Sequence, residues 1–186
     1  MMKLLSDYSR TETALIAAAG ASAALLAAAH LFERVGGLAP CVLCLDQREA
    51  HWTAFAVAAI GLLFARVLKS KLGAAAAVGA VALVYAVSTG LSFYHTGVEF
   101  QFWPGPAICA AGGADGPVSL DARAAALSGP ADAPACDDVP WTFLGVSMAG
   151  YNMLASAGLF ALTAFAAAAE TRRARKGRAV FSPNHP

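Results

Sequence analysis

Four cysteines are the residues of this sequence whose type and spacing are best suited to chemistry. Cys41 and Cys44 form a C-x-x-C pair in the stretch APCVLCLDQREAHW, whereas Cys109 and Cys136 lie far apart. A C-x-x-C pair is an effective redox device because each thiol can resolve a mixed disulfide formed on the other, and a helix N-terminus favours the thiolate. A disulfide within so small a ring removes little loop entropy, which disfavours a purely structural role for this pair.

Zinc binding and haem attachment are two other uses of closely spaced cysteines. A zinc site made of four cysteines usually contains two closely spaced pairs, and only Cys41 and Cys44 are close in this sequence. A c-type haem site needs a histidine directly after the second cysteine, but Leu45 stands there. We therefore expect no metal at these cysteines. A disulfide between Cys109 and Cys136 would close a long loop and stabilise it by about 2–4 kcal/mol, so that pair, taken alone, fits a structural role.

Charged residues are scarce and unevenly distributed. Only 13% of the 186 residues are charged, about half of the usual share. Four stretches contain no Asp, Glu, Lys or Arg, namely residues 13–32, 50–65, 72–98 and 139–169. A membrane-spanning helix needs roughly 20 mostly apolar residues; three stretches reach that length, and the second reaches it with a few flanking residues. The absence of a polar face with helical period disfavours a soluble helical bundle. The length of the first stretch disfavours a cleaved signal peptide, whose apolar region has about 7–15 residues.

We therefore predict an all-α fold, a polytopic membrane protein with a bundle of four transmembrane helices in a single domain over residues 1–170. The predicted helices span about 12–32, 45–68, 72–95 and 146–169. Two loops, about 33–46 and 96–146, lie on the same side of the membrane, and a short helix is possible within the second loop at residues 119–128. A basic tail over residues 171–186 is expected to be irregular.

The distribution of basic residues predicts the orientation. Ten of the 13 Lys and Arg residues lie at the termini or between the second and third predicted helices, and the exceptions are Arg34, Arg48 and Arg123. By the positive-inside rule, both termini are cytoplasmic and the two loops are outside. All four cysteines then lie on the oxidising side of the membrane, which favours disulfide formation.

Arg48 and His95 are candidate partners of the C-x-x-C pair. Arg48 lies one helical turn after Cys44 on the same face, and a cation without a partner is costly in lipid, so we expect it beside the thiolate; snorkelling to the headgroups is the alternative. A thiol pair at a membrane edge needs an electron acceptor, and a lipid-soluble quinone takes two electrons and two protons. His95, in SFYHTG, is placed to donate a hydrogen bond to a quinone oxygen, although histidine at a helix end also suits the membrane interface.

The sequence around these positions resembles the DsbB family, the quinone reductases that generate disulfides in the bacterial inner membrane. PCVLCLDQR is similar to the first-loop signature of the family, and FYHTG followed by aromatic residues, proline and Cys109 is similar to the approach to its second loop. WTFLGVSMAGYN, after Cys136, is similar to the entry to its fourth helix. The resemblance covers about residues 10–170 and implies an inner (plasma) membrane protein with periplasmic cysteines.

The resemblance also implies catalytic roles for all four cysteines. Cys109 would be attacked by a reduced thiol of a periplasmic, DsbA-like protein with the thioredoxin fold, and Cys136 would then attack Cys41. The electrons would reach a quinone, either ubiquinone or menaquinone, at a site formed by Cys44, Arg48 and His95. The expected partners are thus the DsbA-like protein, the quinone pool and the lipid bilayer, with no nucleic acid.

The second loop departs from the family pattern because it consists mostly of alanine, glycine and proline where the family has a more apolar and aromatic segment. The difference affects two properties that depend on this loop: whether it docks on the membrane, and which partner protein it binds. Two alternatives stay open: a dedicated relative that serves one partner or client, and a non-catalytic membrane protein with two structural disulfides.

Overall fold

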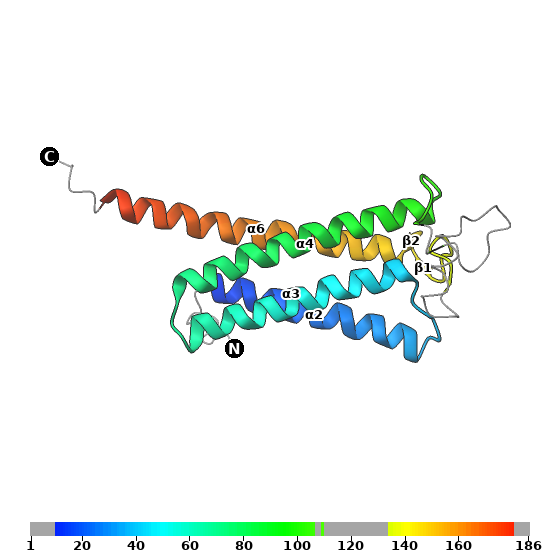
Figure 1. Ribbon diagram of the computed structural model, residues 1–186, viewed down its shortest axis with the longest axis horizontal. Coiled ribbons are helices and arrows are strands. Elements are labelled where there is room, and N and C mark those ends of the chain that lie inside the picture. Colours follow the sequence, from blue (N-terminus) through cyan, green and yellow to red (C-terminus); the bar gives the residue numbers. More distant parts are fainter. Residues whose placement is uncertain (1–9, 107–108, 110–133, 181–186) are drawn as a thin grey trace.

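Four long helices form an antiparallel bundle in the computed structural model, which describes residues 10–106, 109 and 134–180 (Figure 1). The helices are α2 (Arg10–Arg34), α3 (Val42–Arg66), α4 (Lys71–Glu99) and α6 (Met148–Val180). Helix α3 packs against α2 and α4, and α4 also packs against α6. The end of α2, the start of α3, the end of α4 and the start of α6 lie together at one end of the bundle, and this end carries the cysteines.

The helices have the composition of membrane-spanning segments. Helices α2, α4 and α6 each contain a segment long and apolar enough to cross a membrane. Helix α3 has 25 residues, but Asp46, Arg48 and Glu49 make its first turns polar. Large apolar side chains face outward (among them Leu83, Phe93, Phe160, Leu162 and Phe165), whereas serine and threonine hydroxyls are buried between helices. Because lipid favours apolar side chains outside and paired polar groups inside, this distribution confirms the predicted four-helix transmembrane bundle.

Small side chains allow the helices to pack closely at the centre of the bundle. The buried core contains Leu15, Ala18, Ala54, Ala58, Val78 and Val81. Gly61 permits the close approach of α3 and α4, because a Cβ at this position would lie 2.6 Å from the Cβ of Ala77. The Tyr85 hydroxyl lies 2.8 Å from Ser22 Oγ and donates to the backbone oxygen of Ala18 at 2.9 Å. These bonds connect α4 to α2 without leaving a buried hydroxyl unpaired.

A short hairpin leads into α6. Strands β1 (Thr142–Phe143) and β2 (Val146–Ser147) pair in antiparallel fashion. Their two-residue turn has positive φ angles at Leu144 (51°) and Gly145 (76°), as expected for a tight hairpin turn. The Oγ of Ser147 accepts a hydrogen bond from the backbone N–H three residues later, at 3.1 Å. The hairpin therefore fixes where α6 begins at the cysteine end of the bundle.

The second helix begins earlier than predicted. We predicted its start near Leu45, directly after Cys44, whereas α3 begins at Val42 and includes Cys44 in its first turn. The reason is local: Cys41 acts as the N-cap, and its sulfur accepts a hydrogen bond from the backbone N–H of Cys44. A cysteine is not a usual N-cap residue, so the pattern of apolar residues alone did not indicate this start.

The fourth helix is longer than predicted. Helix α6 continues beyond the apolar stretch as far as Val180, so the expectation of an irregular tail is wrong for residues 171–180. Alanine, arginine and lysine have high helix propensity, and they allow the helix to continue outside the apolar region. The short helix predicted at residues 119–128, and the question of whether that loop docks on the membrane, lie outside the described residues.

Candidate functional site

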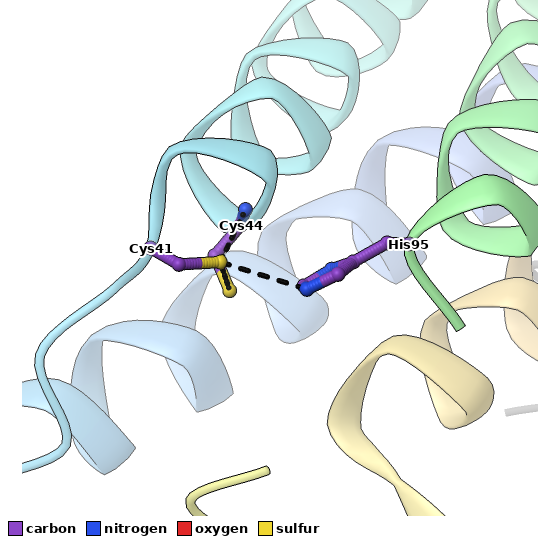
Figure 2. Close-up of side chains that lie close together, drawn as sticks. All are labelled: Cys41, Cys44 and His95. Carbon is purple, nitrogen blue, oxygen red and sulfur yellow. Dashed lines mark hydrogen bonds between the residues drawn. The ribbon is translucent and has the colours of Figure 1, made fainter. Parts of the chain in front are cut away.

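Cys41 and Cys44, which we call the inner pair, lie at the N-terminus of α3. Cys41 Sγ donates a hydrogen bond to Cys44 Sγ at 2.7 Å and accepts one from the Cys44 backbone N–H at 3.2 Å. Both residues are free thiols, and Figure 2 shows their side chains next to each other at the start of the helix. The sulfurs are so close that the pair can interconvert between dithiol and disulfide with little movement of the backbone.

The two thiols of the inner pair have different environments. Cys41 is buried, with 4% of its surface exposed, whereas Cys44 is half-buried. The hydrogen bond to Cys44, together with burial, raises the pKa of the Cys41 thiol far above the ordinary range. The proton between the sulfurs therefore stays on Cys41, and Cys44 is the more accessible sulfur.

His95 of α4 lies between the two cysteine pairs. Its Nδ1 is 2.8 Å from Gln47 Nε2, which can only donate, so the ring proton is on Nε2. That Nε2 lies 3.2 Å from the backbone oxygen of Cys136 and 3.6 Å from Cys41 Sγ. Figure 2 shows the imidazole pointing at the inner pair. His95 therefore holds the inner pair and the backbone of Cys136 in one arrangement, and both of its ring nitrogens have protein partners.

Cys109 and Cys136, which we call the outer pair, form the expected disulfide, with Cα atoms 5.2 Å apart. Both are buried and share a small cluster with Cys41, Leu43, Val98 and Trp103. Trp103 is held in this cluster because its Nε1 donates to the backbone oxygen of Tyr94 at 2.9 Å. The structure thus brings together at one end of the bundle the four cysteines that the sequence separates by up to 95 positions.

Arg48 makes its hydrogen bonds with α2. Its guanidinium pairs with the carboxylate of Glu33 and also donates to the backbone oxygen of Ala29 at 3.3 Å. We expected Arg48 to pair with the Cys44 thiolate, but its counter-charge is supplied by Glu33. Arg48 nevertheless lines the same cavity as Cys44, so its charge lies at the wall that the inner pair also forms.

A cavity of about 360 Å³ opens beside the inner pair. Its walls come from α2, α3, α4, α6, β1 and the segment before β1, and most of its lining is apolar, including Leu25, Phe32, Trp141 and Phe143. The polar groups at the wall include Cys44, Arg48, His51, His95 and Glu99. A mostly apolar cavity with few polar groups is typical of a site for a small organic molecule, and the volume is sufficient for one ring system.

A buried polar network continues from His95 into the bundle. Gln47 Oε1 accepts from Ser92 Oγ at 3.1 Å and from Asn152 Nδ2 at 2.7 Å. Asn152 Oδ1 lies 2.8 Å from His51 Nε2. The network ties α3, α4 and α6 together next to the cavity, and it fixes the orientation of the Gln47 amide that positions His95.

The residues that support the site were not predicted from the sequence. The sequence indicated the four cysteines, Arg48 and His95, but not a second set consisting of Glu33, Gln47, His51, Ser92 and Asn152. A signal was present, since three of the missed residues are polar side chains within uncharged, apolar stretches, and such residues in membrane helices are costly and usually functional.

Comparison with known proteins gives consistent matches. A family model described as disulfide bond formation protein DsbB matches residues 11–166. A disulfide bond formation protein B of Shewanella sp. strain ANA-3 is 31% identical over 147 residues, which is 78% of this chain and 81% of that protein. The protein of the same name from Shewanella sp. strain MR-4 is 29% identical over 88% of this chain and 91% of its own length.

A relative from a third organism gives the same result. The disulfide bond formation protein B of Pasteurella multocida strain Pm70 is 34% identical over 68% of this chain and 69% of its own length. No solved structure gave a significant match. The family match covers all four helices through most of α6 and includes both cysteine pairs.

Proposed function

We propose, from the premise that this chain belongs to the DsbB family, that it generates disulfides by passing electrons from a DsbA-like periplasmic dithiol to a membrane quinone. Because it belongs to this family, the chain is a multi-pass membrane protein that functions in disulfide bond formation. The observation that carries the finer proposal is the position of Cys44, which belongs to the inner pair and also lines an apolar cavity. A dithiol in contact with a site for an apolar molecule is what transfer of electrons to a quinone requires.

Electron transfer begins at the outer pair. A thiolate of the partner attacks Cys109, breaks its bond to Cys136 and forms a mixed disulfide; Cys136 then attacks Cys41 of the oxidised inner pair and releases Cys44 as a thiolate. The second thiol of the partner attacks its own mixed disulfide, which yields the oxidised partner and the free thiol of Cys109. Each step is an exchange between a thiolate and a disulfide and needs no metal.

The free thiol of Cys109 restores the outer disulfide by attacking Cys136, and the inner pair is then left as a dithiol. This distribution, with the outer pair oxidised and the inner pair reduced, is the one in the structure. Closing the inner disulfide releases two electrons and two protons. His95 supports the exchange because its Nε2 contacts both Cys41 and the backbone of Cys136.

The residues around the cavity fit a quinone. Phe32 and Trp141 offer aromatic surfaces, Arg48 carries N–H donors for a quinone oxygen, and Cys44 presents its sulfur at the wall. His95 lines the cavity as well, but its ring nitrogens already have partners, so we assign it to the wall and to the positioning of the cysteines. When bound, the quinone supplies the acceptor for two electrons and two protons.

The test is quinone-dependent oxidation of a reduced, DsbA-like protein by the purified chain in lipid nanodiscs. We expect one quinone to be consumed for each partner disulfide formed, measured by quinone absorbance and by thiol titration of the partner. Cys44→Ser should abolish turnover, whereas Trp52→Phe, an exposed position on the same helix, should leave it unchanged.

Two outcomes would favour the alternatives. A chain with only structural disulfides would consume no quinone with any dithiol partner, and unchanged turnover in Cys44→Ser would also reject the proposed path. Turnover with one thioredoxin-fold partner but not with others would instead identify a dedicated relative.

A further inference from the structure

The inner pair and His95 have the composition and arrangement of a metal site. Cys41 Sγ, Cys44 Sγ and an imidazole nitrogen of His95 all lie within 4.8 Å of one another. Figure 2 shows the three side chains converging from α3 and α4. We propose that the reduced inner pair and His95 bind Zn²⁺, so that metal binding and the inner disulfide exclude each other.

The sequence disfavours a zinc site made of four cysteines, because only Cys41 and Cys44 are closely spaced. Such a site is absent from the described residues because the outer pair is joined in a disulfide. Two thiolates and one imidazole are nevertheless a common donor set for zinc, with a fourth position left for water or another ligand. That combination becomes visible only when the fold places His95 of α4 beside the N-terminus of α3.

The distances require only a small adjustment. Tetrahedral zinc with Zn–S bonds of about 2.3 Å and Zn–N bonds of about 2.1 Å places its ligand atoms roughly 3.5–3.8 Å apart. Cys41 Sγ and His95 Nε2 are already 3.6 Å apart. The two sulfurs, at 2.7 Å, must separate by about 1 Å to reach that range, which rotation of the Cys44 side chain about its Cα–Cβ bond can provide.

The surroundings also suit an imidazole ligand. To bind through Nε2, His95 moves its proton to Nδ1, where it needs an acceptor. Gln47 faces that atom at 2.8 Å and can present its amide oxygen when its amide group and that of Asn152, which donates to the Gln47 oxygen at 2.7 Å, rotate together. A hydrogen bond from the second ring nitrogen to a fixed acceptor is the usual support of a zinc-bound histidine.

The charge of a buried Zn²⁺ at this site would be balanced by the two cysteine thiolates. Binding releases one proton from each thiol, so two thiolates neutralise the two charges of Zn²⁺ and no oxidant or reductant is needed. The fourth position can face the cavity, since Cys41, Cys44 and His95 all lie at its wall. The Glu99 carboxylate, which accepts a hydrogen bond from Ser147, lies at the same wall and adds negative charge there.

The consequence for activity rests on the proposed function. Zn²⁺ bound to both sulfurs holds the inner pair in the dithiol state and prevents closure of its disulfide, so the ion should inhibit turnover reversibly. Binding itself does not depend on a quinone or on a partner protein, so the two can be tested separately.

The experiment measures binding of Co²⁺, a spectroscopic substitute for Zn²⁺, to the full chain with Cys109→Ala and Cys136→Ala, so that only the inner pair supplies thiols. We expect one Co²⁺ per reduced chain, with thiolate charge-transfer bands and tetrahedral d–d bands that disappear when Zn²⁺ is added. The oxidised chain should bind none.

Further variants test each ligand. Cys44→Ser should remove most of the thiolate charge-transfer absorption, and Gln47→Leu should weaken binding about tenfold because the hydrogen bond that orients His95 is lost. His95→Gln should weaken binding as well, and His95→Cys should restore it, which distinguishes loss of a ligand from loss of folding. His30→Gln, which removes a partly exposed imidazole outside the site, should change nothing.

Absence of stoichiometric Co²⁺ binding by the reduced chain would overturn the zinc site, as would equal binding by the parent chain and the Cys44→Ser variant. If quinone-dependent turnover is present but metal binding is absent, only the zinc inference fails. If metal binding is present but no dithiol is oxidised, only the proposed function fails.

Discussion

Arg48 places a positive charge at the wall of the cavity that Cys44 also lines, and Glu33 holds it there. We predict that Arg48→Met raises the KM for quinone about tenfold, since a hydrogen bond to a charged group is worth about 1.5–3 kcal/mol, and that kcat changes less. The measurement is steady-state quinone reduction over a range of quinone concentrations. Arg34→Met removes one positive charge from an exposed position at the C-terminal end of α2 and should leave the KM unchanged. If both variants raise the KM equally, the effect of Arg48 comes from overall charge and not from a hydrogen bond to the quinone.

The proton arrangement of the inner pair gives a prediction about reactivity. Because Cys41 is buried and its pKa is raised by the hydrogen bond to Cys44, we expect alkylation of the fully reduced chain at pH 8 to modify Cys44 and leave Cys41 unmodified. Mass spectrometry of the peptides distinguishes the two sites. Equal rates at both cysteines would contradict the assignment of the proton to Cys41.

The same raised pKa has a consequence for stability. A group whose pKa is higher in the folded state stabilises the fold below its unfolded pKa, and this contribution is lost as the pH rises. The unfolded value for cysteine is about 8.5. In the reduced chain, the contribution of protonated Cys41 is therefore fully present at neutral pH and decreases in alkaline solution, whereas the contribution of Cys44, whose pKa is lowered by the same hydrogen bond, increases as the pH rises.

Packing between α4 and the segment that follows it controls the position of the outer pair. A Cβ at Gly97 would lie 1.9 Å from Trp103 Cζ2, whereas a Cβ at Gly90 of the same helix would meet nothing within 4 Å. We predict that Gly97→Ala displaces Trp103 from the cluster around the cysteines and destabilises the protein by about 1–3 kcal/mol, as overpacking commonly does. Thermal unfolding in detergent measures the effect.

Gly90→Ala is the matched control for this prediction. It should be neutral or stabilising by up to about 1 kcal/mol, because alanine has the higher helix propensity. Equal unfolding temperatures of the two variants would show that contact with Trp103 does not constrain Gly97.

The sequence predicted the four helices because uncharged stretches long enough to span a membrane directly reflect the cost of charge in lipid. It also indicated the cysteines, Arg48 and His95, whose chemistry is recognisable without a fold. It did not predict that Glu33 pairs with Arg48, or that Asn152 lies between Gln47 and His51. Those contacts depend on how each helix is rotated about its axis, and helices that are apolar on all sides contain little information about that rotation.

Across the whole bundle, polar side chains are unequally distributed along the helix axes. The inner pair, the Arg48–Glu33 ion pair and the network around Gln47 all lie toward one end, while the centre is packed with alanine, valine and the Tyr85–Ser22 hydrogen bond. The polar network is therefore buried between the apolar centre and the cysteines. Such an arrangement keeps the reactive groups together and leaves the lipid-facing surface apolar.

The orientation of the bundle is the remaining prediction, and it follows from the excess of Lys and Arg at the opposite end. In a chain with all four cysteines replaced by serine, we expect Val35→Cys, in the connection after α2, to react with a membrane-impermeant maleimide in intact spheroplasts. Leu68→Cys, between α3 and α4, should react only after permeabilisation. Both positions are well exposed, at 79% and 59%, so a difference in labelling reports the side of the membrane and not burial. The reverse pattern would place the cysteines in the cytoplasm, where reducing conditions oppose stable disulfides, and the path from a periplasmic partner to the inner pair would then be untenable.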